Sequence, residues 1–355
     1  MYVNDYKQLY MLARALHMSR SNYCNLLITL GEVLMRKSLL LTAVLSTLAL
    51  PTYSFADEAA APAAEAPAVA PAAPAAEAPS AGAPAVAPAA AAAPTPTWTF
   101  PSSISLVSDY IWRGQTQTWG KPAVQAGIEV DHASGFYAGL WGSNVSSHWL
   151  PNANLETDWS VGFRNTFLTD FKYDIGGTYI YYPGANFDKV PAATTTVGGV
   201  NTPFNSSVLN SVELYASLGW KWFSVKGGIM PTKYYGWNVN NSGYAGAFPN
   251  NPKAVVTGST NGSGYISGSF SYDLPAGFNI AGTVGREMIA NANGLDWNWY
   301  QLGVTKSFDG GWAVNGFFTG TSGSSAYKSY ASFDDLSQTK SIDKSKFVIG
   351  LTKSF

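Results

Sequence analysis

Alternation of apolar and polar side chains, repeated from Thr97 to Phe355, is the feature that most constrains the fold of this chain. Between Val124 and Asp131 the even-numbered residues are apolar, while the odd-numbered ones are Gln, Gly, Glu and Asp. The same period recurs in 156–164, 171–181, 212–218 and 278–287. A period of two over so many segments predicts β-strands, and no helical period competes with it.

The connections between these segments alternate between short and long. Five short turns are expected at 132–135, 168–170, 221–222, 274–277 and 309–311. Six longer connections rich in Gly, Asn, Ser and Pro are expected at 114–122, 145–154, 183–210, 232–264, 288–295 and 321–344. This arrangement predicts an all-β, transmembrane antiparallel up-and-down β-barrel of twelve strands, with short periplasmic turns and long extracellular loops. Closure is expected because lipid offers no partners to the edge of an open sheet.

The last strand supports the membrane interpretation. Phe347, Ile349, Leu351 and Phe355 share one face, and the chain ends on an aromatic ring. The segment resembles the C-terminal signal that barrel-assembly machinery recognises, in which Phe347, Leu351 and Phe355 would take part, although Lys353 stands where a second aromatic is usual. The alternative is the edge strand of a soluble β-protein.

The N-terminal part predicts secretion. Residues 35–56 combine Met35-Arg36-Lys37, an apolar run and a small-residue cleavage site, which is the pattern of a signal peptide cut between Ala56 and Asp57. The apolar run is shorter than the roughly 20 residues that a membrane-spanning helix needs. Residues 1–34 are interpreted as an upstream extension from a misplaced start codon, with an extended signal as the alternative.

Residues 57–96 form a linker of Ala, Pro and a few Glu. They contain no aromatic residue and no apolar period, so they are expected to stay disordered in the periplasm. The linker is either a passive spacer or a tether that contacts peptidoglycan. Residues 97–355 are then the barrel domain.

Charge and composition exclude several classes of protein. From Thr97 onward Lys plus Arg number sixteen and Asp plus Glu also number sixteen, and all twelve Trp lie in this part. A nucleic-acid-binding protein needs a basic surface, so none is expected here. The single cysteine, Cys24, lies in the upstream extension, so a mature chain would have no disulfide.

Four segments resemble a known family. Ser108–Gly114 is similar to the opening strand of the TorF-like porins, which are conserved hypothetical outer-membrane proteins of proteobacteria; Pro122–Gly127, Gly135–Asn144 and Tyr181–Gly184 fit the same family. The resemblance covers roughly 102–355 and implies a porin. It brings no substrate and no assigned functional residues.

Twelve ionisable residues are the candidates for lining a pore, because a charge on the lipid face would cost roughly 2–4 kcal/mol for Arg or Lys near the midplane. They are Asp109, Arg113, Glu129, Glu156, Asp158, Arg164, Lys172, Asp174, Glu213, Lys226, Arg286 and Glu287. Two interpretations stay open: a charged constriction that selects solutes, or a mesh of ion pairs that fills a narrow lumen.

Catalysis is not expected. The part from Thr97 onward holds only His132, in a short turn, and His148, which follows Ser146 and Ser147 in a long connection. A Ser/His pair like that of outer-membrane phospholipases would need a supported His beside the Ser. Clustered Cys and His are lacking, so no metal and no cofactor are expected.

The sequence therefore predicts a porin-like channel for passive diffusion of small solutes in the outer membrane of a Gram-negative bacterium. Its expected partners are outer-membrane lipid, lipopolysaccharide and the barrel-assembly machinery. The alternative is a non-conducting structural or adhesive surface protein that uses the barrel as an anchor.

Overall fold

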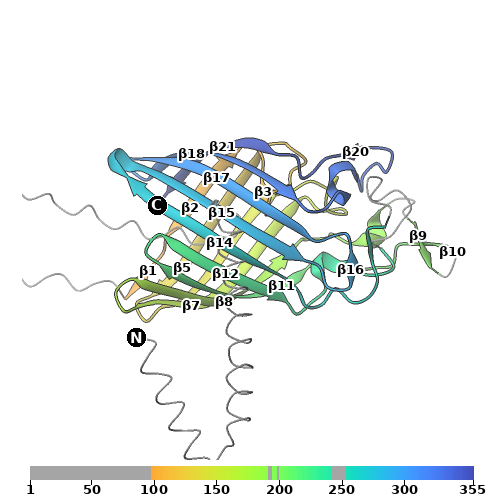
Figure 1. Cartoon of the computed structure of the whole chain (residues 1–355), viewed down its shortest axis with the longest axis horizontal. Helices are drawn as coiled ribbons and strands as arrows, with labels where there is room; N and C mark the ends of the chain where they lie inside the picture. Colours follow the sequence, from red (N-terminus) through yellow and green to blue (C-terminus); the bar gives the residue numbers. More distant parts are fainter. Residues whose placement is uncertain (1–96, 191–193, 198–199, 242–252) are drawn as a thin grey trace, which may run out of the picture. The chain divides into compact units, whose positions relative to one another are not determined.

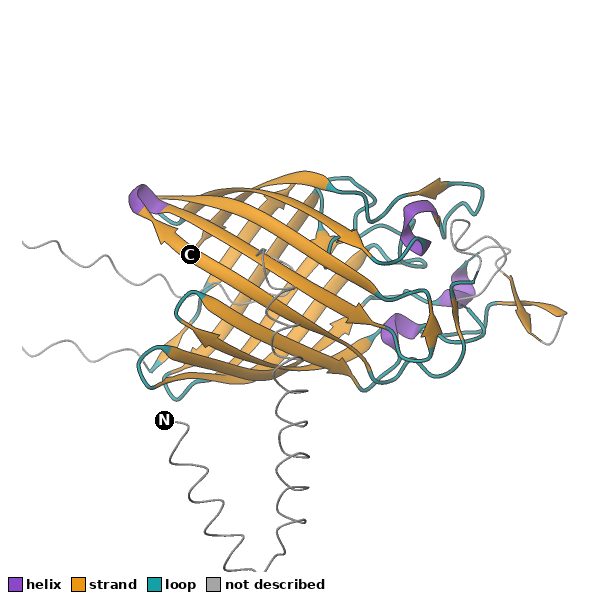
Figure 2. Ribbon diagram, viewed as in Figure 1, coloured by secondary structure: helices purple, strands orange, loops and turns teal. Residues whose placement is uncertain are grey.

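Twelve antiparallel strands close into a barrel in the computed structural model, which describes residues 97–190, 194–197, 200–241 and 253–355 (Figures 1 and 2). The expected extension 1–34, signal peptide 35–56 with its Ala56–Asp57 cleavage site, and linker 57–96 lie outside the described residues. The wall strands are β2 (Ser102–Val107), β5 (Ala123–His132), β6 (Phe136–Asn144), β7 (Leu155–Phe167), β8 (Phe171–Tyr181), β11 (Ser211–Trp220), β12 (Phe223–Met230), β14 (Ser263–Leu274), β15 (Phe278–Met288), β17 (Trp297–Phe308), β18 (Trp312–Ser322) and β21 (Lys346–Ser354).

The first and last wall strands pair with each other and close the sheet. Ser103 of β2 is opposite Ser354 of β21, and Val107 is opposite Gly350. The other edge of β2 pairs with β5, and β1 (Trp98–Thr99) continues that pairing along β5. The prediction of a closed barrel of twelve strands, in which the C-terminal strand meets the first, is confirmed.

The five short connections lie together at one end of the barrel, here called the short-turn end, and the six longer ones at the other, the loop end (Figure 2). All five turns have residues with positive φ, such as Gly135 at 105° and Gly310 at 73°. The loop end carries the remaining short elements: β3 (Ile111–Trp112), β4 (Gln115–Thr116), η1 (Phe187–Lys189), β9 (Thr194–Val197), β10 (Val200–Pro203), η2 (Tyr234–Gly236), β13 (Val255–Val256), β16 (Ala292–Asn293), η4 (Ala326–Ser329), β19 (Tyr330–Ala331) and β20 (Thr339–Lys340). At the short-turn end lie η3 (Pro275–Gly277) and β1, which pairs with the last residues of β5. No helix in the described ranges is long and apolar enough to cross a membrane.

Most apolar side chains of the wall lie outside and most polar ones lie inside. On β7, Trp159 and Val161 are 54% and 64% exposed, whereas Glu156 and Ser160 are 3% and 6% exposed. The predicted outer face of β21 follows the same rule, with Phe347, Ile349, Leu351 and Phe355 all exposed. This distribution is the reverse of that in a soluble protein, whose large apolar side chains are mostly inside.

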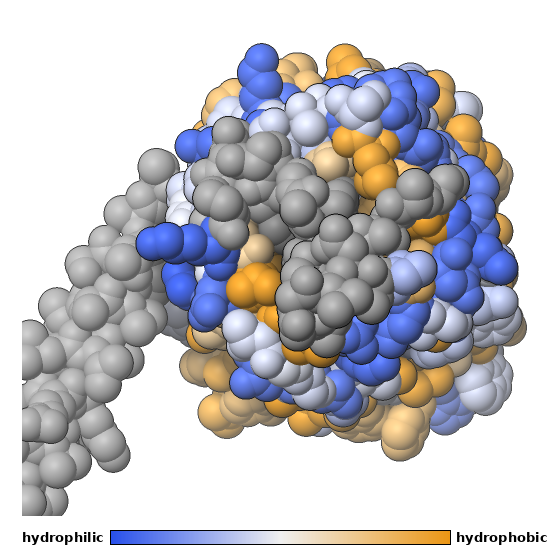
Figure 3. Space-filling view, turned by 90° about the vertical axis from the view of Figure 1, so that its right-hand side faces the viewer, coloured by the Kyte–Doolittle hydropathy of each residue, from blue (hydrophilic) through white to orange (hydrophobic). Residues whose placement is uncertain are grey.

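Aromatic rings gather on the outer face near the short turns. Phe171 stacks on Phe167 and lies 6.4 Å from Trp220, measured between ring centroids. Further along the same rim, the Trp222 ring meets Tyr272 edge-on at 5.2 Å. Figure 3 looks onto the opposite, loop end, where polar residues (blue) cover much of the visible surface and apolar ones (orange) are frequent at the periphery.

Candidate functional site in the barrel lumen

The connection between β2 and β5, residues 108–122, folds into the lumen and is here called the plug segment. Its strands β3 and β4 form a small hairpin whose tip is Arg113 and Gly114, with φ of 45° and 83°. Two successive residues with positive φ are the signature of a type I′ hairpin turn, which explains the glycine. A Cβ at Gly114 would also approach the carbonyl oxygen of Gly320 to 2.8 Å, so the tip lies tightly against the wall.

The Arg113 side chain is fully buried between two wall carboxylates. Its guanidinium donates to Glu213 on β11 and to Glu287 on β15, each at 2.9 Å, and the three side chains are 0%, 6% and 0% exposed. Around the barrel, β11 is five strands from β2 in one direction and β15 is four strands in the other. Arg113 therefore ties the plug segment to the far side of the wall.

Aromatic faces complete the environment of this guanidinium. The Arg113 Cζ lies 3.5 Å from the centroid of the Tyr265 ring, 4.3 Å from that of Trp112 and 5.8 Å from that of Trp299. Tyr265 and Trp299 stand over Gly228 and Gly285 of neighbouring strands, where a Cβ would overlap the rings. Glu213, Tyr265, Glu287 and Trp299, all on the wall, are here called the acidic–aromatic box.

Further contacts hold the first part of the plug segment. Asp109 accepts hydrogen bonds from Thr116 Oγ1 at 2.5 Å and Thr118 Oγ1 at 2.9 Å, and it pairs with Lys346 Nζ at 2.9 Å. The Tyr110 hydroxyl donates to Glu156 Oε1 at 3.3 Å, on β7. Ile111 packs in a small apolar cluster with two wall residues of β18 and β21, Phe317 and Val348. The segment is thus bound to the wall on several sides.

The short-turn half of the lumen contains a second, more accessible network. Arg164 binds Glu129, whose side chain is 3% exposed, and, at 2.5 Å, Asp131; the Arg164 and Asp131 side chains are 30% and 22% exposed. The Tyr137 hydroxyl lies 2.8 Å from Asp174 and 2.5 Å from the Tyr215 hydroxyl. The contrast with the buried Arg113 pairs shows that water reaches this half of the lumen.

The opposite side of the wall, from β14 round to β2, presents mainly hydroxyl and amide groups. Ser269 hydrogen-bonds with Thr283, and Ser105 with Thr352, each at 2.8 Å across adjacent strands. The polar side chains of this side that lie nearer the short turns are half-buried, including Ser105, Ser271, Asn279, Thr305 and Thr352. Thr283, Gln301 and Thr319 are buried.

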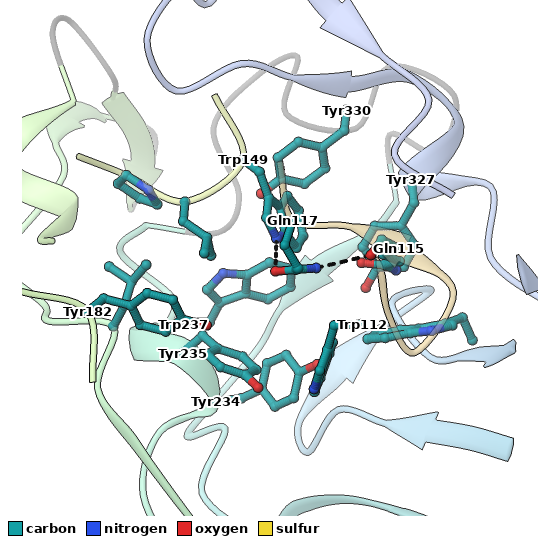
Figure 4. A pocket seen from close by; sticks show the side chains of 14 residues that line it. Trp112, Gln115, Gln117, Trp149, Tyr182, Tyr234, Tyr235, Trp237, Tyr327 and Tyr330 are labelled. Atoms are coloured by element: carbon teal, nitrogen blue, oxygen red, sulfur yellow. Dashed lines mark hydrogen bonds between the residues drawn. The ribbon is translucent and has the colours of Figure 1, made fainter. Parts of the chain in front are cut away.

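Rings from the plug segment and from the other long connections gather around a small cavity at the loop end of the barrel (Figure 4). This aromatic cap consists of Trp112, Trp149, Tyr182, Tyr234, Tyr235, Trp237, Trp297, Tyr327 and Tyr330. Between them remains a cavity of about 20 Å³, little more than one water needs. Trp149 Nε1 donates a hydrogen bond to Gln117 Oε1 at 2.7 Å. Burial within the cap raises the pKa of the Tyr235 hydroxyl well above its usual range.

The structure brings most of the predicted pore residues to the lumen side. The wall residues that face inward are Glu129, Glu156, Asp158, Arg164, Lys172, Asp174, Glu213, Lys226 and Glu287, with Lys172 exposed at the short-turn rim. Asp109 and Arg113 also point into the lumen. They were expected on an opening strand, which is wrong because β2 ends at Val107 and both belong to the plug segment.

The inward placement of Arg286 is also wrong. Glu287 is fully buried inside the barrel, and successive residues of a strand point to opposite faces. Arg286 therefore lies outside, where it pairs with Asp296 at 3.2 Å and is 49% exposed. The residues that sequence reasoning missed are Tyr110, Asp131, Tyr265, Trp299 and Lys346. Alternation puts Asp131 on the same face as Glu129, so the sequence did contain a signal for Asp131. Nothing in the sequence indicated that the Tyr265 and Trp299 rings would face Arg113.

Neither of the two histidines that the structure describes is arranged for catalysis. His148 Nδ1 is 2.8 Å from Ser332 Oγ and 3.6 Å from Asp334 Oδ2, so the serine and the carboxylate approach the same nitrogen. A catalytic triad needs them on different ring nitrogens. His132 Nδ1 contacts Ser134 in its turn at 2.7 Å. Among the described residues no group of His, Cys, Asp and Glu is arranged to hold a metal ion.

A closed wall around a polar, plugged lumen defines this as an up-and-down β-barrel protein. The chain belongs to the family described as "Bacterial protein of unknown function (Gcw_chp)", whose sequence model matches residues 90–355. The TorF-like name suggested by the sequence stays a prediction. No curated protein matches the chain.

Several solved structures of outer-membrane proteins are similar in fold. A KdgM porin in complex with disordered oligogalacturonate has 10% identity and a TM-score of 0.40, over 72% of this chain and 99% of that one. A NanC porin has 6% identity and a TM-score of 0.39, over 72% and 99%. The COG4313 outer membrane channel from Pseudomonas putida F1 has 11% identity and a TM-score of 0.36, over 74% and 97%. At these scores the likeness carries no argument about what this chain binds.

Proposed function

We propose that this protein is an outer-membrane channel of a Gram-negative bacterium through which small solutes diffuse passively. The exposed apolar outer face and the aromatic rings near the short turns suit a lipid environment. In this proposal the short-turn end is periplasmic, the loop end is extracellular, and lipid and lipopolysaccharide surround the wall.

The observation that carries the proposal is how the lumen is filled. Its short-turn half is lined by charged and hydroxyl-bearing side chains that water reaches, such as Arg164 and Asp131. Its loop half is closed by the plug segment and the aromatic cap, which come mostly from connections between the strands rather than from the wall. In an eight-stranded barrel the side chains of the wall fill the interior, and a twelve-stranded barrel encloses more space than that. A polar vestibule that ends at segments separate from the wall strands fits a solute path with a constriction.

One observation favours the alternative of a non-conducting structural or adhesive protein. Arg113, Glu213 and Glu287 are almost inaccessible to water, so the path is closed at their level. A channel has to move the plug segment to conduct, whereas an anchor does not.

Planar-bilayer recordings decide between these functions. The purified barrel is compared with a variant in which residues 110–116 are replaced by a short Gly-Ser linker. A matched control replaces the β9–β10 hairpin, which lies outside the wall, in the same way. Current from the native form, or from the plug variant and not the control, supports the channel. Silence of both the native and plug-replaced forms would establish the anchor. A salt gradient across the bilayer then gives the charge preference.

A further inference from the structure

The guanidinium of Arg113 occupies a site built mainly by other segments of the chain, and Trp112 is its one ring from the plug segment. Glu213, Tyr265, Glu287 and Trp299 come from β11, β14, β15 and β17, and none of them belongs to the plug segment. Arg113 reaches this acidic–aromatic box only because the plug segment carries it there. Box and occupant are therefore separable parts.

The chemistry of the box suits a planar organic cation. Two carboxylates accept from two different nitrogens of the guanidinium, Nη1 and Nη2, each at 2.9 Å. The Tyr265 face lies 3.5 Å from the guanidinium carbon, a distance at which cation–π attraction is strong in a water-excluded site. Charge-assisted hydrogen bonds in fixed directions favour a fork-shaped donor over a spherical ion.

Without its occupant the box would be unfavourable. Two buried carboxylates would face each other without their shared cation, and an uncompensated buried charge strongly destabilises a protein. Loss of the two Arg113 pairs therefore favours the uptake of another cation, or of protons, by Glu213 and Glu287. This preference makes the box a receptor for positive charge whenever the plug segment leaves.

We infer that the acidic–aromatic box is a binding site for small organic cations of the guanidinium class, and that Arg113 is a tethered occupant which such a cation replaces. Guanidinium-bearing molecules are then the solutes that the lumen favours. The statement about solutes rests on the proposed channel function; binding in the box does not.

Chemical replacement of the missing side chain tests the inference. In Arg113→Ala, millimolar guanidinium should produce a saturable upward shift of the thermal unfolding temperature in detergent. Urea, which has the same planar shape without the charge, should produce none at equal concentration. The native barrel, whose box is filled, should show no such shift.

A second variant keeps the test decisive. Arg113→Ala combined with Glu213→Gln and Glu287→Gln has the same space but no carboxylates, so guanidinium should not stabilise it. An equal shift in the single and triple variants, or no shift in either, would overturn the inference. If Arg113→Ala does not fold alone, its refolding yield is measured instead: recovery with guanidinium and not urea supports the site, and no recovery refutes it.

Failure of this test can be told apart from failure of the proposed function. The binding measurements use protein in detergent and need no conduction. If binding is found but the bilayer recordings are silent, the box stands and the channel falls. If current is found without guanidinium binding, the channel stands and the box falls.

Discussion

The two halves of the lumen are built by the same wall strands and differ because of the connections that fill one of them. In the short-turn half, the Arg164 and Asp131 side chains are 30% and 22% exposed. In the loop half, the corresponding Arg113 and Glu287 side chains are both 0% exposed. The wall alternates in the same way along its whole length, so the wall does not set this difference. The plug segment and the aromatic cap do, so access to the lumen is set by the connections rather than by the wall strands.

The largest effect is expected where a buried pair is broken. Arg113→Ala leaves two buried carboxylates and should lower the free energy of unfolding by about 3–5 kcal/mol. Equilibrium urea unfolding in detergent, followed by tryptophan fluorescence, measures the change. If the free energy of unfolding falls by less than about 1 kcal/mol, the value of an exposed ion pair, the loop half is not sealed as described.

A cation placed on the outer wall should have the next largest effect. Leu351→Lys puts a charge on the face where Leu351 is 43% exposed, at a cost of up to roughly 2–4 kcal/mol if that face meets lipid. Ser354→Ala, on the inner face of the same strand, is the matched control and should be mild. Heat-modifiable migration after folding into bilayers gives the readout. Equal folding of the two variants would contradict a lipid-facing wall.

The terminal ring should matter for assembly more than for stability. Phe355 is 75% exposed, so its side chain makes little packing contact. Its backbone N–H donates to the carbonyl oxygen of Ser102 at 2.9 Å. Phe355→Ala should reduce recovery in outer-membrane fractions while purified protein still refolds in detergent. Normal recovery in cells would remove Phe355 from the proposed assembly signal.

The smallest effect is expected in the accessible half. Asp131→Asn leaves Arg164 its second partner, Glu129, and removes only a half-exposed pair. The expected loss is within about 1 kcal/mol and should shrink further in high salt. A loss as large as that of Arg113→Ala would erase the distinction between the two halves.

The wall could be predicted from the sequence, whereas the plug segment could not. Period two reports which face a residue takes, and it was enough to give the strands, their turns and inward residues such as Glu213. Applied strictly from Phe278 it would also have put Arg286 outside. Tyr110-Ile111-Trp112 reads like a continuing strand, because nothing local interrupts it. The fold turns inward there through contacts distant in sequence, such as Asp109 with Lys346, 237 residues apart.

The central claim, that the plug segment seals one half of a lumen whose other half is open to water, is tested most directly by thiol reactivity. Thr305 and Thr319 are lumen-facing threonines on the adjacent strands β17 and β18; Thr305 is half-buried and Thr319 is 0% exposed. Each is replaced by cysteine in a chain that carries Cys24→Ser, and labelling by a small charged thiol reagent is followed by mass spectrometry. Thr305→Cys should react quickly and Thr319→Cys slowly, and replacing residues 110–116 should make Thr319→Cys react as quickly as Thr305→Cys. Equal reactivity of the two cysteines with the plug segment in place would contradict the account.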